Sequence, residues 1–241
     1  MDKTFIKNLS LSIRASFENA VRLLEDSQYL LEYERFPTAF ALSILAQEEF
    51  AKTFLLLLVK DGALPWDSNV HRALRDHTCK QLVASIMDYL DSESEKWTQT
   101  YLATQTFPST AFPSHIADAL NIIHLEKLPR DERFLWEDGS CDEQARAIAD
   151  GEIDKQKQNA VYVSLGKTGQ LTSSPAKITK SVAALEYEKT TRLKYGFNPY
   201  GQDVEISKSI MHTRVFDTFR MFYGSMSREE YDRLWKDYPS S

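Results

Sequence analysis

The segment SILAQEEFAKTFLLLL, from Ser43 to Leu58, sets two adjacent glutamates and a lysine inside an otherwise apolar stretch. An uninterrupted apolar run, from Phe54 to Val59, follows directly. Burying a carboxylate that has no partner costs free energy. Glu48 and Glu49 must therefore either reach water or meet a basic group from elsewhere in the chain.

Helical geometry decides between these outcomes. At 100° per residue, Glu48 and Lys52 share one narrow stripe with apolar residues. These are Ala41, Leu45, Leu55 and Val59. The simplest alternative is a solvated i, i+4 Glu–Lys pair that contributes about 0.2–0.5 kcal/mol. Because the stripe continues into leucine and valine, we expect it to be buried, with Glu49 on the adjacent ridge.

The next segment supplies basic partners. HRALRDHTCK, from His71 to Lys80, holds five basic or imidazole side chains and one acid, Asp76. Glutamates buried opposite this cluster would be neutralised, and they would hold its basic groups in position. We therefore expect Glu48 and Glu49 to face His77.

The rest of the 241-residue chain predicts one mostly helical domain over residues 1–241. The 42% of hydrophobic residues, with only eight glycines and eight prolines, argue against an all-β or disordered chain. Periodic apolar residues predict a long N-terminal helical hairpin ending near Lys60, then further helices, with those of about 176–241 packing on or extending the bundle. The further helices are expected at about 67–90, 116–125, 142–159, 175–194, 204–222 and 227–235. A strand or short β-hairpin is expected near 161–172.

Composition excludes several classes. A net charge of −6 argues against a wholly basic nucleic-acid-binding surface but not against a local basic site. Two cysteines cannot form a disulfide framework, and the N-terminus lacks the apolar core of a signal peptide. The protein is therefore predicted to be cytoplasmic, without membrane contact. No Cys/His cluster or paired Glu-x-x-His motif is present, so neither a metal nor a cofactor is predicted.

Four stretches, taken in order, resemble one protein family. They are ENAVRLLEDSQYL (Glu18–Leu30), AFALSILAQEEFAKTFLL (Ala39–Leu56), RDHTCK (Arg75–Lys80) and KQNAVYVSLGKTGQLTSSP (Lys157–Pro175). Together they are similar to the AbiV-type abortive-infection branch of the HEPN superfamily, over roughly residues 5–195. An E-E-x-x-K element and an H-x-x-K element of that family are present. They are formed by Glu48, Glu49 and Lys52, and by His77 and Lys80. Ser164 replaces the aspartate that the family usually carries.

The resemblance implies an all-α HEPN-like bundle and a bacterial anti-phage protein. It implies a metal-independent endoribonuclease that cuts RNA and arrests translation, with an R-x4-H motif from Arg72 to His77. Arg72, His77 and Lys80 are then the implied catalytic residues. The supporting shell would be Glu48, Glu49, Lys52 and Asp76, and the RNA contacts would be Arg75 and His71. RNA as substrate, a homodimer and a phage-encoded activator are the implied partners.

The chemistry fits these residue types. A histidine exchanges protons near neutral pH and can take the 2′-hydroxyl proton or protonate the leaving oxygen. An arginine can clamp a phosphate and stabilise its developing charge. On a regular helix, however, Arg72 and His77 would lie about 140° apart, so they converge only through long side chains, a distorted turn or a second subunit.

Two alternatives stay open from sequence. Arg72 could instead be a buried ion-pair partner of Glu48, since it lies near the apolar face of its helix. The protein could also be a non-catalytic HEPN binder that senses a phage product or blocks translation. A homodimer is expected in either case, because the Leu55–Val59 run is apolar all round and one helical hairpin covers only part of it.

Overall fold

The computed structural model describes residues 2–104, 112–129, 142–200, 203–206 and 210–235. Two long antiparallel helices begin the fold, α1 (Lys3–Glu32) and α2 (Phe36–Lys60), as predicted. The Asp2 carboxylate caps α1 by accepting a hydrogen bond from the Phe5 amide. Apolar residues at steps of three and four bury one stripe of α1 against α2. That stripe comprises Leu9, Ile13, Phe17, Ala20 and Leu24.

Two helices replace the single helix expected from about residue 67 to 90. The first, α3 (Ser68–Ala73), is one short segment capped by Asp67. The second, α4 (His77–Thr104), begins after a turn at 74–76. A new cap explains the break, since the Asp76 carboxylate accepts hydrogen bonds from the Cys79 amide and the Thr78 hydroxyl. His77 therefore stands at the first residue of α4.

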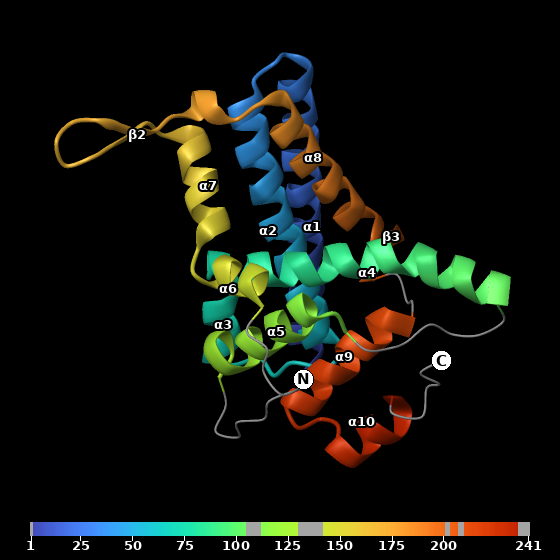
Figure 1. The fold of residues 1–241 in the computed structure, drawn as a ribbon. Helices are drawn as coiled ribbons and strands as arrows, with labels where there is room; N and C mark the ends of the chain where they lie inside the picture. The colour runs from blue at the N-terminus through green and yellow to red at the C-terminus, as the bar shows by residue number, and fades with distance from the viewer. Residues whose placement is uncertain (1, 105–111, 130–141, 201–202, 207–209, 236–241) are drawn as a thin grey trace.

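The next two predicted helices are present, but each changes along its length. Helix α5 (Ser114–Ile122) passes into a π-helical turn at Ile123–Lys127. The expected helix over 142–159 is two helices, α6 (Glu143–Ala149) and α7 (Glu152–Val161). Gly151 separates them because its φ of 87° lies in the left-handed region that glycine adopts without strain. This break lets α7 turn up along α2 (Figure 1).

The predicted hairpin near 161–172 is confirmed. Strands β1 (Ser164–Leu165) and β2 (Leu171–Ser173) pair antiparallel, with Ser164 opposite Ser173 and Leu165 opposite Leu171. The hairpin projects from the body of the molecule (Figure 1). A short 3-10 turn at Pro175–Lys177 then leads into α8 (Lys180–Tyr195), capped by the Thr179 hydroxyl.

The expectation of a helix from Val204 was wrong. A second antiparallel hairpin, β3 (Phe197–Tyr200) and β4 (Asp203–Ile206), comes first, and α9 (Ile210–Phe222) and α10 (Arg228–Trp235) follow. The pairing is regular, with Phe197 opposite Ile206. Phe197 stacks between aromatic rings of α1 and α2, which gives this short strand an anchor.

Two clusters of buried apolar side chains form the core, and the smaller one joins α2 to α7 and α8 through Ile44, Ala160 and Ala183. Helix α4 runs crosswise over the α1–α2 hairpin, while α7 and α8 pack along α2 (Figure 1). One cluster of buried apolar side chains extends from Leu9 to Trp235. The C-terminal helices join it, and Phe216 of α9 packs edge-on against Phe54 of α2. The described residues thus confirm an all-α fold with two short hairpins.

The same core changes the argument for a dimer. Every residue from Leu55 to Val59 is buried within a single chain. The apolar run therefore needs no second copy to cover it, and the homodimer stays a prediction that rests on the family resemblance. No helix in the described ranges combines the length and apolar character needed to cross a bilayer.

Candidate active site

Glu48 lies at the meeting point of α2, α4 and α7. Its side chain is only 2% exposed. One carboxylate oxygen, Oε2, lies 2.5 Å from Nδ1 of His77 and 3.2 Å from Nζ of Lys80. The other, Oε1, accepts hydrogen bonds from Nζ of Lys157 at 2.7 Å and from Nε2 of Gln81 at 3.1 Å. The buried acid is therefore compensated by groups from two neighbouring helices.

The charge of Glu48 is stabilised despite its burial. Burial alone would raise the pKa of this carboxyl, because a low-dielectric environment disfavours the charged form. The hydrogen bond from Lys157, the charges of Lys80 and Lys157, and the hydrogen bond with His77 outweigh burial and lower the pKa below its usual value. Glu48 is thus an ionised carboxylate at neutral pH.

This carboxylate orients the His77 ring. Lys157 Nζ also lies 3.3 Å from Nδ1 of His77, but the 2.5 Å contact with Glu48 is much the shorter. We therefore place the ring proton on Nδ1, where it is donated to Glu48, so that the neutral ring keeps a lone pair on Nε2. The side chain is 51% exposed. Its Nε2 makes no hydrogen bond within the described residues, and it is available to a substrate.

Asp76 fixes where this histidine stands. Its carboxylate caps α4, so that His77 occupies the first position of the helix. Burial would raise the pKa of Asp76, but hydrogen bonds from Thr78 and Cys79 and the charge of Lys127 lower it. Lys127 Nζ lies 3.5 Å from this carboxylate and 2.5 Å from the Thr78 hydroxyl. The acid therefore positions the helix end rather than touching the imidazole.

The prediction did not include Lys157 and Asp154 of α7. Nζ of Lys157 lies 2.7 Å from Glu48 and 2.7 Å from Asp154, so one ammonium bridges two carboxylates. Burial would raise the pKa of Asp154, but its hydrogen bond and ion pair with Lys157 lower it. An i, i+3 Asp–Lys pair in the charged segment before the hairpin was the only signal in the sequence.

The same geometry bears on metal binding. Ligand atoms of Glu48, His77 and Asp154 lie within 4.8 Å of one another, the spacing of a three-ligand metal site. However, the Lys157 ammonium lies in hydrogen-bonding distance of all three. A metal ion bound there would have to displace this positive charge, so the donor set is arranged around an ammonium ion.

The structure does not bring Glu49 and Lys52 to this cluster. They pair with each other along α2 at 3.4 Å, and their side chains are 20% and 34% exposed. The expected contact of Glu49 with His77 is absent from the described residues, as is the Glu48–Lys52 pair. One residue step, about 100° of rotation, directs Glu49 away from α4.

Lys80 is nearly inaccessible. Its side chain is 8% exposed, and its ammonium group is directed at Glu48. This geometry suits neutralisation of Glu48 better than contact with RNA. Cys79 beside it is a buried thiol whose pKa burial raises to about 12, so it is an inert core residue.

The three basic residues of α3 and its turn are exposed. Arg72 donates to the carbonyl of Lys127 at 3.3 Å, and Arg75 donates to the carbonyl of His71 at 3.2 Å. The His71 ring packs 4.2 Å from that of Trp66. Arg72 does not pair with Glu48, so the alternative of a buried ion pair is wrong. The distorted turn is present, yet no hydrogen bond joins Arg72 to His77 in the described part of the chain.

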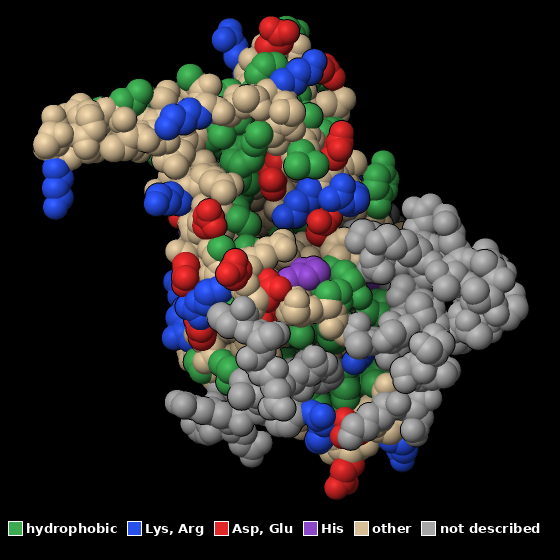
Figure 2. Space-filling view, in the orientation of Figure 1, with side chains coloured by type: hydrophobic (Ala, Val, Ile, Leu, Met, Phe, Trp, Pro, Cys, Tyr) green, Lys and Arg blue, Asp and Glu red, His purple; other side chains and the backbone are tan. Residues whose placement is uncertain are grey.

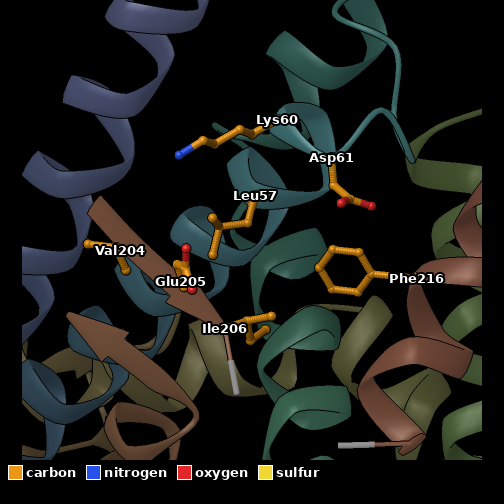
Figure 3. Close-up of a pocket in the computed structure, with 7 residues that line it drawn as sticks. All are labelled: Leu57, Lys60, Asp61, Val204, Glu205, Ile206 and Phe216. Atoms are coloured by element: carbon orange, nitrogen blue, oxygen red, sulfur yellow. The ribbon is translucent and has the colours of Figure 1, made fainter. Parts of the chain in front are cut away.

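A separate hollow of about 250 Å³ lies between the end of α2, β4 and α9. Figure 3 shows Leu57, Ile206 and Phe216 around it, with the Lys60 ammonium pointing away. That ammonium pairs with Asp203. Asp61 at the rim pairs with Arg220. Lys60 and Asp61 are both engaged in ion pairs, so the His77 cluster is the stronger candidate for chemistry.

Comparisons with known proteins identify the family of this chain. A model of the HEPN_AbiV family, described as AbiV, matches residues 9–194, which include α2, α4, α7 and most of α1 and α8. The searches of curated proteins and of solved structures found no match. Because the matched segment spans well over half of the sequence and contains all of the Glu48–His77–Lys157 cluster, the chain belongs to the AbiV family of HEPN proteins.

Proposed function

We propose that this protein is an anti-phage abortive-infection endoribonuclease that uses His77 and needs no metal. The observation that carries the proposal is the contact between the buried Glu48 carboxylate and Nδ1 of His77, at 2.5 Å. A carboxylate that holds one ring nitrogen fixes the tautomer and leaves the other nitrogen to act as a general base. The His77 side chain is half exposed, and RNA would approach it from the Nε2 edge.

The reaction follows from that geometry. Nε2 of His77 removes the proton of a ribose 2′-hydroxyl, and O2′ attacks the adjacent phosphorus. The bond from phosphorus to O5′ breaks, and the leaving oxygen takes a proton from water. The products are a 2′,3′-cyclic phosphate and a 5′-hydroxyl end. Glu48 stabilises the imidazolium that forms, as an ionised carboxylate hydrogen-bonded to the protonated ring.

Phosphate binding falls to the exposed basic residues. Lys80 and Lys157 are offset by Glu48 and Asp154, so the inner cluster carries no net charge until His77 is protonated. Arg72 and Arg75 are exposed beside the start of α4, and guanidinium groups bind phosphate oxygens well. We propose that they contact the RNA backbone, that the active species is a homodimer triggered by a phage-encoded protein, and that RNA cleavage arrests translation.

The test is an RNA cleavage assay in excess EDTA, with and without lysate of phage-infected cells as a source of activator. We expect the wild type to leave 2′,3′-cyclic phosphate ends. His77→Ala should lose about 100-fold or more of this activity, since general base catalysis contributes that much. Glu49→Gln, one residue from Glu48 but outside the cluster, should cut normally. Equal cutting by His77→Ala, or none by the wild type under either condition, would contradict the proposal.

One observation favours a second function. Arg72 is engaged with the Lys127 carbonyl and Lys80 is buried, so two of the three predicted catalytic residues do not face Nε2 of His77. A HEPN protein that blocks translation or senses a phage product by binding alone would need no more than this. In that case His77→Ala would keep full protection against phage in cells, whereas the ribonuclease proposal requires protection to be lost.

A further inference from the structure

A polar hollow lies farther along α4 from His77. Its volume is about 260 Å³, and it opens between α4, α5, α6 and α8. The lining side chains used below are Ser85, Asp88, Tyr89, His115, Gln144 and Lys189. Figure 2 shows Lys and Arg side chains next to Asp and Glu side chains on this face of the molecule, just above the level of α4. No residue of this hollow belongs to the cluster around Glu48.

The hollow is in line with His77. Asp88 follows His77 by eleven residues, which is three turns of α4 plus about 20°. The two positions therefore share one face of the helix, separated by roughly 16 Å along its axis. Gln81 and Ser85 lie between them on the same side of α4. Gln81 is buried against Glu48, so a strand that reaches both His77 and the hollow would cross the surface above it over about that distance.

One cation of the hollow makes no ion pair within the described residues. Asp88 is neutralised by Arg192, whose Nε lies 2.8 Å from the carboxylate. Lys189 contributes a half-buried ammonium that makes no ion pair within the described residues. His115 adds an imidazole, which lies edge-on to the Tyr89 ring at 6.2 Å. Asp142, which caps α6 and keeps its negative charge, interacts with His115, so Lys189 is the cation of this hollow that is left for a ligand.

Its size and remaining groups fit a nucleotide. Gln144 and Ser85 offer hydrogen-bond donors and acceptors, and Tyr89 and His115 offer aromatic surface. A phosphate beside a cation, with a base against aromatic and amide groups, is how proteins hold single-stranded RNA. We propose that this hollow binds a nucleotide of the RNA strand near the one cut at His77, with Lys189 contacting its phosphate. This inference rests on the proposed function.

The experiment separates binding from cutting. The probe is a short fluorescent single-stranded RNA with 2′-O-methyl riboses, which cannot be cut because it lacks the attacking hydroxyl. Binding to the full-length protein is followed by anisotropy at several salt concentrations. Lys189→Glu and Gln144→Glu are compared with Lys180→Glu, an exposed position nine residues earlier and about 180° around α8.

We expect Lys189→Glu to raise the dissociation constant about tenfold or more, since it removes a charge-assisted contact. The slope of log affinity against log salt should fall by about one. Gln144→Glu should weaken binding in the same direction, and Lys180→Glu should stay within about twofold of the wild type. Equal effects of Lys189→Glu and Lys180→Glu, or no binding by the wild type, would overturn the inference.

The two proposals fail separately. If natural RNA is not cut but Lys189→Glu still weakens binding selectively, the ribonuclease is refuted and the nucleotide site is supported. If natural RNA is cut in a His77-dependent way but Lys189→Glu binds like the wild type, the nucleotide site is refuted and the ribonuclease stands.

Discussion

Glu48 and Glu49 are neighbours in the chain, yet the structure gives them opposite surroundings. Glu48 is 2% exposed and is contacted by four side chains from α4 and α7. Glu49 is partly exposed and, among the residues that the structure describes, pairs only with Lys52, three residues along its own helix. The composition of the two sites is similar, because each holds a carboxylate and an ammonium group. Their tertiary context differs.

The contrast shows what a buried ion pair can do that an exposed one cannot. The Glu49–Lys52 pair adds little free energy, because water competes for both charges. Glu48 has given up its water, so its partners must stay in place or leave a buried charge unpaired. That requirement fixes the position of His77. We infer that Glu48 orients the His77 ring, whereas Glu49 is a polar residue on the water-facing side of α2.

The largest expected effect is the difference in stability between a protein without the Glu48 carboxylate and one without the Glu49 carboxylate. Glu48→Ala leaves Lys80 and Lys157 close together in a nearly dry site without their common counter-charge. We expect it to lower the free energy of unfolding by about 3–5 kcal/mol. Glu49→Ala should change it by about 0.5 kcal/mol or less. Urea unfolding of the three proteins measures this difference, and equal losses would remove the distinction between the two acids.

Replacing the lysines sharpens the same comparison. Lys157→Ala removes one hydrogen bond to Glu48 and one to Asp154, so we expect a loss of about 1.5–3 kcal/mol. Lys52→Ala should cost about 0.5 kcal/mol or less. RNA cleavage by Lys157→Ala should also fall, because Lys157 holds the Glu48 carboxylate, which in turn orients the His77 ring. A Lys157 variant as stable as the Lys52 variant would show that α7 does not brace the site.

The stability of the Glu48 and Glu49 variants should also depend differently on pH. The pKa of Glu48 is lowered in the folded protein, so its contribution to stability is fully present above its ordinary pKa near 4.5. That contribution disappears as the pH falls through the lower, folded value. The stability difference between the wild type and Glu48→Gln should therefore shrink on acidification below about pH 4.5. Guanidinium unfolding at a series of pH values tests this, with Glu49→Gln as the control expected to follow the wild type.

The smallest effect is expected at Gly151. An alanine there would be held at a φ of 87°, a conformation that costs an L residue about 1 kcal/mol. There is room for the methyl group, whose nearest neighbour would be the Thr78 side chain at 3.9 Å. Gly151→Ala should thus lower the thermal midpoint slightly and loosen α7 at the cluster without altering the Glu49–Lys52 pair. A stabilised variant would contradict the assignment of this break.

Sequence alone could locate the inner part of the site. The helical phase of α2 placed Glu48 on a buried stripe, and the run from His71 to Lys80 offered the only dense cluster of basic groups nearby. Together they predicted that Glu48 faces His77, whereas the contact of Glu48 with Lys80 was not singled out. The β1–β2 hairpin was also predictable, since β-branched residues and glycines cluster there.

The rest depended on tertiary structure. Lys157 reaches Glu48 across 109 residues of chain, and no local pattern reports such a contact. The break at Asp76 was not predicted, because an aspartate before a periodic apolar pattern can either cap a new helix or lie inside a continuous one, and the sequence is the same in both cases. β3 and β4 were missed because the four-residue β4 merges in sequence with the periodic run of α9.

The central claim is that Glu48 holds Nδ1–H of His77 and leaves Nε2 open. Nitrogen-15 NMR of the histidine rings at neutral to mildly alkaline pH tests it most directly, with His77→Ala used to assign the signals. We predict that neutral His77 carries its proton on Nδ1 in the wild type and in Glu49→Gln, and that this preference is lost in Glu48→Gln. A His77 ring protonated on Nε2 in the wild type, or unchanged by Glu48→Gln, would contradict the account.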